Sequence, residues 1–185
     1  MRPSFSSPFF FAFLLCIIIH GVTSQENLIN KTCKTFAKDD PNINSNFCTT
    51  SLQAAPASQC ATLHGLGTIS IRLVRYNVTD TRCNIKHLIK DKKWDPYVKQ
   101  CLNDCLELYS DALDSVKKAM KAYNSKRFDD ANVEISSILD AATTCEDGFN
   151  EKEGVVSPLT KRNNNTFLLS AIALNFLHVL QTGSD

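Results

Sequence analysis

Eight cysteines are the residues of this 185-residue chain with the clearest chemistry. They are Cys16, Cys33, Cys48, Cys60, Cys83, Cys101, Cys105 and Cys145. Thiols at this density form disulfides in an oxidising compartment or bind a metal ion. Zinc sites usually draw ligands from C-x-x-C pairs, which this chain lacks, and its histidines are scattered. The spacing therefore favours disulfides over a metal site, and we expect no cofactor.

The sequence does not indicate an enzyme active site. His64, His87 and His178 have no paired nucleophile signature such as G-x-S-x-G, and no Gly-rich phosphate loop is present. The formal net charge is +1, whereas nucleic-acid binding usually requires a basic patch or stripe. We therefore predict no catalytic residues and no nucleic-acid partner.

The N-terminus indicates export. Arg2 precedes an apolar run over residues 9–19, which is too short to span a bilayer and is typical of a signal peptide. We predict removal of residues 1–24 by cleavage between Ser24 and Gln25, which leaves no membrane segment. The mature chain keeps an odd number of cysteines and has equal numbers of acidic and basic residues.

Three N-x-S/T sequons agree with export, because such triplets are N-glycosylation acceptors in secreted proteins. They begin at Asn30, Asn77 and Asn164. Each sequon is a weak signal alone, since short triplets also occur by chance. Together with the signal peptide they predict an extracellular protein.

Helical periodicity dominates the mature chain. Apolar residues follow a strict heptad seam from Phe128 to Phe149, and a second seam runs from Cys101 to Ala122. Small residues dominate the latter half of the second seam, so a partner helix can approach closely there. The helix that carries it can be capped by Asp95, with proline tolerated at its first position.

Two further helices complete a predicted bundle. A long helix is expected over about residues 59–90, with Gly65 and Gly67 as weak spots. A final helix starts after Pro158 or after residues 163–165. Short connections between four helices favour an all-α, antiparallel up-down-up-down four-helix bundle.

An N-terminal extension over residues 25–55 precedes the bundle of residues 56–185. Two short helices are expected in it, over about 26–38 and 43–53. Cys33 and Cys48 flank the break between them, so a disulfide would staple a helical hairpin. Closing a loop of about 15 residues is worth roughly 3 kcal/mol in the chain-entropy model.

Several short motifs stand in a distinctive order along the mature chain. They are Thr32-Cys33, Phe47-Cys48, Leu102-Asn103-Asp104-Cys105, Cys145-Glu146-Asp147-Gly148-Phe149 and Val156-Ser157-Pro158-Leu159-Thr160. Together they resemble the plant invertase and pectin methylesterase inhibitor family, and the last two are most similar to its plane-tree pollen allergen branch. The resemblance implies a four-helix bundle with a helical hairpin extension. It also implies the disulfides Cys33–Cys48 and Cys105–Cys145.

The resemblance further implies an inhibitor of acid invertase or of pectin methylesterase. In invertase inhibitors a Pro-Lys-Phe motif before the third bundle helix enters the active-site cleft, and the matching residues here are Lys126, Arg127 and Phe128. Lys126 replaces the proline, which removes a fixed φ and weakens the invertase assignment. Alternatively, Phe128 begins the core seam and the two cations are solvated loop charges.

Pectin methylesterase inhibitors of this family instead cover the enzyme's cleft with polar surface on the bundle helices. Exposed carboxylates are candidates for that surface here, namely Asp111, Asp114, Glu134 and Asp140. A solvated helix face is the alternative interpretation of each.

Three cysteines of the mature chain fall outside the implied pairs. Cys83 and Cys101 each lie about two turns from a predicted turn between antiparallel helices, so a third disulfide between them is geometrically feasible. Cys101 could instead replace Cys105 as the partner of Cys145. Cys60 is predicted to share a helix with Cys83 and to lie about 35 Å from it. We therefore expect Cys60 to be the odd thiol, either free or joining two chains in a dimer.

These observations predict a secreted, monomeric inhibitor of the apoplast or cell wall. It would block the active-site cleft of pectin methylesterase, which is slightly favoured, or of acid invertase, in a stoichiometric complex. The alternative is a non-inhibitory, allergen-like bundle protein. Lipid transfer is disfavoured, because the adjacent Cys-Cys pair expected for that class is absent.

Overall fold

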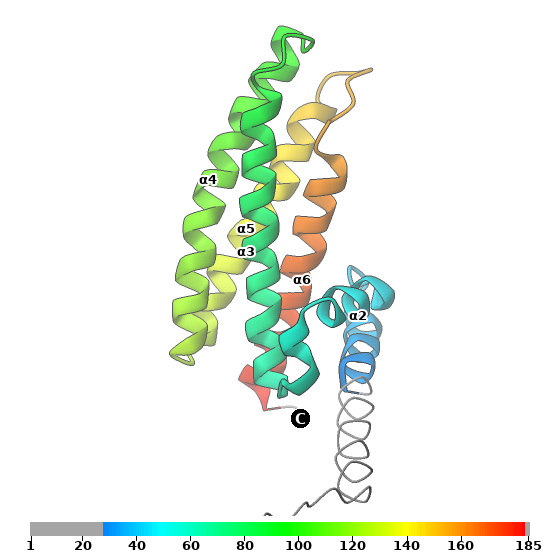
Figure 1. Ribbon diagram of the computed structural model, residues 1–185, viewed down its shortest axis with the longest axis vertical. Helices are drawn as coiled ribbons and strands as arrows, with labels where there is room; N and C mark the ends of the chain where they lie inside the picture. The colour runs from blue at the N-terminus through cyan, green and yellow to red at the C-terminus, as the bar shows by residue number, and fades with distance from the viewer. Residues whose placement is uncertain (1–27, 184–185) are drawn as a thin grey trace, which may run out of the picture.

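The computed structural model describes residues 28–183 (Figure 1). The predicted signal peptide and its cleavage site lie outside these residues. The described part consists of helices and connections and contains no strand, which confirms the all-α prediction. Its elements are a helical segment over 28–39, α2 (Ser45–Gln53), the 3₁₀-helix η1 (Pro56–Cys60), α3 (Leu63–Leu88), α4 (Pro96–Asn124), α5 (Phe128–Asn150) and α6 (Thr160–Thr182).

Helices α3 to α6 form the predicted antiparallel four-helix bundle. Each helix packs against the next one in the chain, and α6 packs against α3 to close the ring. Figure 1 shows successive helices running in opposite directions. The largest core side chains include Tyr109, Tyr123 and Phe149, which are fully buried. Among residues 28–183, no helix is long and apolar enough to cross a membrane.

The predicted start of α4 and seam of α5 are confirmed. The Asp95 carboxylate accepts a hydrogen bond from the Tyr97 backbone N–H at 2.9 Å, and Pro96 is the first helical residue. The α5 seam is buried except at Phe128, which is half-buried. The buried stripe of α4 is wider than predicted, because Tyr109 also faces the core. Such a stripe is typical of a helix with two bundle neighbours.

The start of α3 differs from the prediction. Thr62 caps the helix by accepting a hydrogen bond from the Gly65 N–H at 3.1 Å, so α3 begins at Leu63. Cys60 ends η1 and lies outside α3. The prediction that Cys60 and Cys83 share one helix is therefore wrong, because the 3₁₀-helix and the cap separate them.

The third disulfide that the sequence made feasible between Cys83 and Cys101 is not formed, since both cysteines are free. Cys83 is exposed on α3, whereas the buried Cys101 thiol donates a hydrogen bond to the Gly148 carbonyl oxygen of α5 at 3.4 Å. The Cys83 thiol is exposed to solvent and the Cys101 thiol faces α5, because packing sets the rotation of each helix about its axis. Cys105 is bonded to Cys145, with Cα atoms 5.0 Å apart, which confirms the second implied pair.

The N-terminal hairpin lies against α3 and α6 near the end of the bundle where α3 begins (Figure 1). Its two helical pieces are joined by the implied disulfide between Cys33 and Cys48, whose Cα atoms are 5.7 Å apart. Phe36 packs edge-on against Phe176 of α6, with ring centroids 4.9 Å apart. No residue of α4 joins the apolar cluster that the hairpin buries. Hairpin and bundle thus share an apolar core. The domain boundary placed between residues 55 and 56 stays a prediction.

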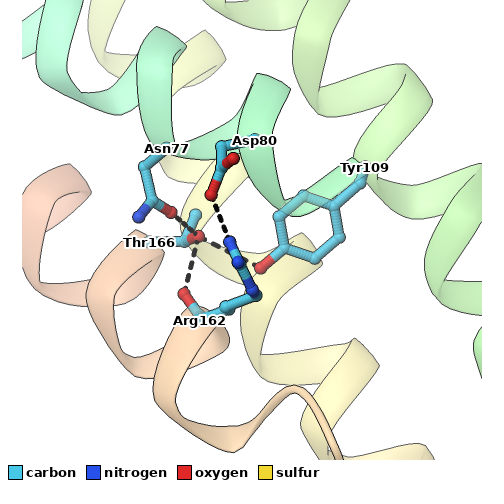
Figure 2. A network of polar contacts seen from close by, with 5 residues as sticks. All are labelled: Asn77, Asp80, Tyr109, Arg162 and Thr166. Carbon is cyan, nitrogen blue, oxygen red and sulfur yellow. Dashed lines mark hydrogen bonds and ion pairs between the residues drawn. The ribbon is translucent and has the colours of Figure 1, made fainter. Parts of the chain in front are cut away.

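A polar network joins α3, α4 and α6 inside the bundle (Figure 2). The hydroxyl oxygen of the fully buried Tyr109 lies 3.1 Å from Thr166 Oγ1. Thr166 in turn donates a hydrogen bond to Asn77 Oδ1 of α3. At the edge of this network Arg162 pairs with Asp80. Because such bonds form only when the three helices are in one register, the network specifies their alignment.

The buried hydroxyl of Tyr109 predicts a loss of stability at alkaline pH. Desolvation raises the pKa of Tyr109 to about 12, from 10.0. Between about pH 10 and 12 the unfolded chain releases this proton while the folded protein keeps it, so stability falls as pH rises through that window. We expect urea midpoints to fall less steeply with pH for Tyr109→Phe than for the unmodified protein. Equal slopes would contradict the assignment.

Candidate functional site

A groove runs along the outer face of the bundle between α4 and α5. It consists of two hollows of about 430 and 280 Å³, which share Leu108 and Thr144 in their walls. Tyr97 lies at one end. At the other end, the Ser137 hydroxyl donates a hydrogen bond to Ser115 Oγ at 3.1 Å. We call these two adjoining hollows the α4–α5 groove.

The charged side chains that line the α4–α5 groove are all acidic. They are Asp104, Asp111, Asp140, Asp147 and Glu151. Within residues 28–183, Asp111 and Asp140 have no hydrogen-bond or ion-pair partner, and both are exposed. Unpaired carboxylates of one sign, gathered along a groove, complement a partner with cationic side chains.

Three features hold the walls of the groove in place. The buried Cys105–Cys145 disulfide joins α4 to α5 beneath it. The Tyr97 hydroxyl donates a hydrogen bond to the Gly148 carbonyl oxygen across the same interface at 2.7 Å. Small side chains on both helices, such as Ala112, let the walls approach closely, as the second seam predicted. The groove is therefore built on two rigid helices rather than on loops.

The α4–α5 loop contains the predicted binding residues, and its backbone is unusual at Lys126. This residue has a φ of 57°, the only positive φ of a non-glycine residue among residues 28–183. Its N–H donates a hydrogen bond to the Tyr123 carbonyl oxygen at 2.9 Å. Proline fixes φ near −65° and has no N–H. The loop therefore cannot accommodate the proline of the Pro-Lys-Phe motif without changing shape.

The two other loop residues are engaged within the protein. The exposed Arg127 guanidinium pairs with Asp130 at 2.6 Å. Phe128 is half-buried, and its ring packs edge-on against that of Tyr123, with centroids 5.6 Å apart. These contacts agree with the alternative in which Phe128 begins the core of α5 and Arg127 is a solvated charge.

The structure brings only two of the four candidate carboxylates into the groove, namely Asp111 and Asp140. Asp114 accepts a hydrogen bond from Lys117 at 2.8 Å, and this bond lowers the pKa of the Asp114 carboxyl. Glu134 lies near the α4–α5 loop, and its Oε1 atom is 3.9 Å from Nζ of Lys118 on α4. A carboxylate therefore lines the α4–α5 groove only if it lies beside the apolar seam of α4 or α5, and exposure alone is not enough.

The remaining carboxylates of the groove were not predicted from the sequence. Asp104 directly precedes Cys105, and Asp147 follows Cys145 by two residues. Both therefore border the core-facing side of their helix at the level of the disulfide. A search for like charges beside the two seams would have found them.

The sequon asparagines and Cys60 do not line the groove. Asn30 and Asn77 are half-buried on helices, and Asn164 is exposed on α6. Cys60 is a free, exposed thiol at the end of η1. Among residues 28–183, no group of three His, Cys, Asp or Glu side chains is placed to hold a metal ion.

Comparison with known proteins points to one family. A protein-family profile described as "Plant invertase/pectin methylesterase inhibitor" matches residues 27–176. A "Putative invertase inhibitor" of Platanus acerifolia is 43% identical over 180 residues, which cover 97% of this chain and 99% of that protein. "Pectinesterase inhibitor 12" of Arabidopsis thaliana is 30% identical over 168 residues, covering 90% of this chain and 95% of that one.

A solved structure has the same fold. It is a mutant form of a pectin methylesterase inhibitor from Arabidopsis, with a TM-score of 0.65 and 25% sequence identity. The match covers 73% of this chain and 89% of that chain. The helical bundle is thus shared with a protein described as an inhibitor.

Proposed function

The chain belongs to the plant invertase/pectin methylesterase inhibitor family, and from this premise we propose that it inhibits a pectin methylesterase. It is a non-enzymatic member of an inhibitor family. In the proposed complex one inhibitor molecule covers the active-site cleft of one enzyme molecule. The covering surface is the polar outer face of α4 and α5, centred on the α4–α5 groove.

The backbone of Lys126 is the observation that carries the choice of target. A loop that inserts into an invertase cleft through Pro-Lys-Phe needs a preorganised proline, and this loop has a left-handed residue at that place. In addition, Phe128 packs against the core instead of projecting as an anchor. The loop therefore lacks the features that would favour invertase.

The α4–α5 groove supplies the surface for the proposed target. Its carboxylates stand on rigid helices, and the hairpin packs mainly against α3 and α6. Charge complementarity of this kind speeds association and sets the register of a complex. We expect the rim of the inhibited cleft to present lysine or arginine side chains to Asp111 and Asp140.

Reversing charge in the groove tests this proposal. The double variant Asp111→Lys/Asp140→Lys should raise the inhibition constant for pectin methylesterase roughly thirtyfold, about 2 kcal/mol, because cationic groove residues would repel a cationic rim. Inhibition is measured by titrating the enzyme with purified inhibitor at low ionic strength. The increase should shrink at high salt, where exposed charges are screened.

A matched control separates the groove from overall charge. Asp39→Lys/Glu153→Lys changes the net charge equally at two exposed carboxylates that make no side-chain hydrogen bond or ion pair within residues 28–183. It should change inhibition less than twofold. A similar loss in both variants, or none in the groove variant, would contradict the proposed surface.

Acid invertase is the second candidate, and the names of two relatives favour it. The Platanus relatives, at 43% and 41% identity, are both named "Putative invertase inhibitor". The same titration against invertase distinguishes the two targets. If invertase is inhibited, Arg127→Ala/Phe128→Ala should abolish that inhibition while leaving the helical circular dichroism intact.

Secretion into the cell wall is part of the proposal and has its own test. The signal peptide and the sequons support it, and Asn164 is the sequon asparagine that is exposed on a helix surface. Protein expressed in plant cells should appear in the extracellular fluid as a monomer beginning at Gln25. A glycosidase-sensitive mass excess should be lost in Asn164→Gln. Retention inside the cells would contradict this part.

A further inference from the structure

A row of cations on α3 has no role in the proposed inhibitory surface. It consists of Arg72, Arg75, Arg82 and Lys86, which we call the basic row. The steps between them are three, seven and four residues, so all four lie on one side of the helix. At 1.5 Å per residue the row is about 21 Å long. The near-zero net charge of the chain gave no sign of it.

The basic row is accessible. Arg72, Arg75 and Lys86 are exposed, and Arg82 is half-buried. The Arg82 Nε–H donates a hydrogen bond to Ser110 Oγ of α4 at 2.9 Å, which holds this guanidinium at the α3–α4 edge. Because α3 packs against α4 and α6, the row lies on a helix that forms neither wall of the α4–α5 groove. A ligand on the row would leave the α4–α5 groove open.

None of the four cations has an acidic partner within residues 28–183, although five other cations of this part do. Asp80, the one carboxylate on α3 itself, pairs instead with Arg162 of α6. The pKa of the Asp114 carboxyl on α4 is lowered chiefly by its hydrogen bond to Lys117, and the charge of Arg82 contributes least. Aligned, unpaired cations repel one another, so the row is not explained by stability.

We propose that the basic row binds a linear polycarboxylate, namely pectin from which methyl esters have been removed. A straight row of guanidinium and ammonium groups matches a polymer with regularly repeated carboxylates, and arginine binds carboxylates through two parallel hydrogen bonds. The identity of the polymer rests on the proposed function. A pectin methylesterase turns neutral methyl esters into carboxylates, so its product is the polymer with the required charge.

The consequence is that inhibitor would accumulate where the enzyme has already acted. An α3-bound molecule still presents its groove to a nearby enzyme, and the local inhibitor concentration rises with the carboxylate content of the wall. This would couple inhibition to the extent of demethylation without any conformational change.

Binding of the purified mature chain to immobilised polygalacturonate tests the inference without any enzyme. The protein should be retained on polygalacturonate but not on highly methyl-esterified pectin, and retention should weaken as salt rises from about 0.05 to 0.2 M. Arg72→Gln/Arg75→Gln/Lys86→Gln should lower the apparent affinity about tenfold. Inhibition of pectin methylesterase in solution by this variant should stay unchanged. Polymer binding by the basic row and inhibition through the α4–α5 groove are therefore tested separately.

A dispersed control has the same loss of charge. Lys38→Gln/Lys121→Gln/Lys161→Gln removes three exposed cations from three different elements and should change affinity less than twofold. Equal losses in the two triple variants would overturn the basic row as the site. Equal retention on esterified pectin, or tighter binding to single-stranded DNA than to polygalacturonate, would overturn the assignment of the ligand.

Discussion

Replacing both Cys105 and Cys145 by alanine is expected to lower the free energy of unfolding by about 4 kcal/mol. The disulfide closes a loop of 40 residues, and the chain-entropy model gives this value for a loop of that size. Both sulfurs are also buried, so their removal leaves unfilled space in the core. The change is measured as the shift of a urea or thermal unfolding curve.

Two comparisons make this prediction specific. Cys60→Ala/Cys83→Ala removes two exposed, free thiols and should change stability by less than about 0.5 kcal/mol. Removing the hairpin pair Cys33–Cys48 should cost roughly 3 kcal/mol, because its loop spans only 15 residues. Stability that is unchanged without Cys105 and Cys145 would mean that core packing alone holds α4 to α5.

The same disulfide has a functional consequence, because it joins the two walls of the α4–α5 groove. In its absence the carboxylates on α4 and α5 would no longer be held at a fixed separation. We expect the alanine variant, at a temperature where it is still folded, to inhibit its target less well than the unmodified protein. Inhibition by the hairpin variant should change less, since the hairpin packs against α3 and α6.

Gly67→Ala is expected to destabilise the protein by about 2 kcal/mol. A Cβ atom at this position would lie 2.2 Å from the hydroxyl oxygen of Tyr123 and 3.3 Å from Cβ of Phe176. Tyr123 cannot easily move, because it is fully buried and its hydroxyl donates a hydrogen bond to the His64 carbonyl oxygen at 2.7 Å. Overpacking of this kind costs more than the roughly 1 kcal/mol that alanine gains over glycine in a helix.

A matched glycine provides the control. A Cβ atom at Gly148 of α5 would meet nothing within 4 Å, so Gly148→Ala should stabilise the protein by up to about 1 kcal/mol. In a Tyr123→Phe background the closest contact at Gly67 disappears, and Gly67→Ala should then cost at least about 1 kcal/mol less. Additive effects of the two changes would contradict the clash as the cause.

The interpretation of Gly67 shows where local reasoning fails. From the sequence, a glycine within a helical pattern is expected to weaken the helix, because alanine in its place would stabilise it. In the folded protein the same glycine lets α3 approach Tyr123 of α4 and Phe176 of α6. This reason involves residues 56 and 109 positions away, which no short window of sequence contains.

The free cysteines illustrate the same point for the candidate sites. Spacing along two helices placed Cys83 and Cys101 at similar heights in the bundle, yet one is exposed and the other faces α5. The height of a residue along the bundle follows from the rise per residue, which is constant. The direction of its side chain depends on which stripe of the helix is buried. The missed groove carboxylates have the same origin, because the groove exists only where α4 and α5 meet.

The sequence alone determined the helices and most of their limits, because caps, proline positions and heptad seams depend on neighbours within one or two turns. It also determined family membership and both disulfides, through motifs that resemble a known family. Only the tertiary structure decided the left-handed backbone at Lys126, the acidic α4–α5 groove, and the exposure and lack of acidic partners of the basic row on α3. Each of these depends on how whole helices are rotated and packed, and that is set by many distant contacts acting together.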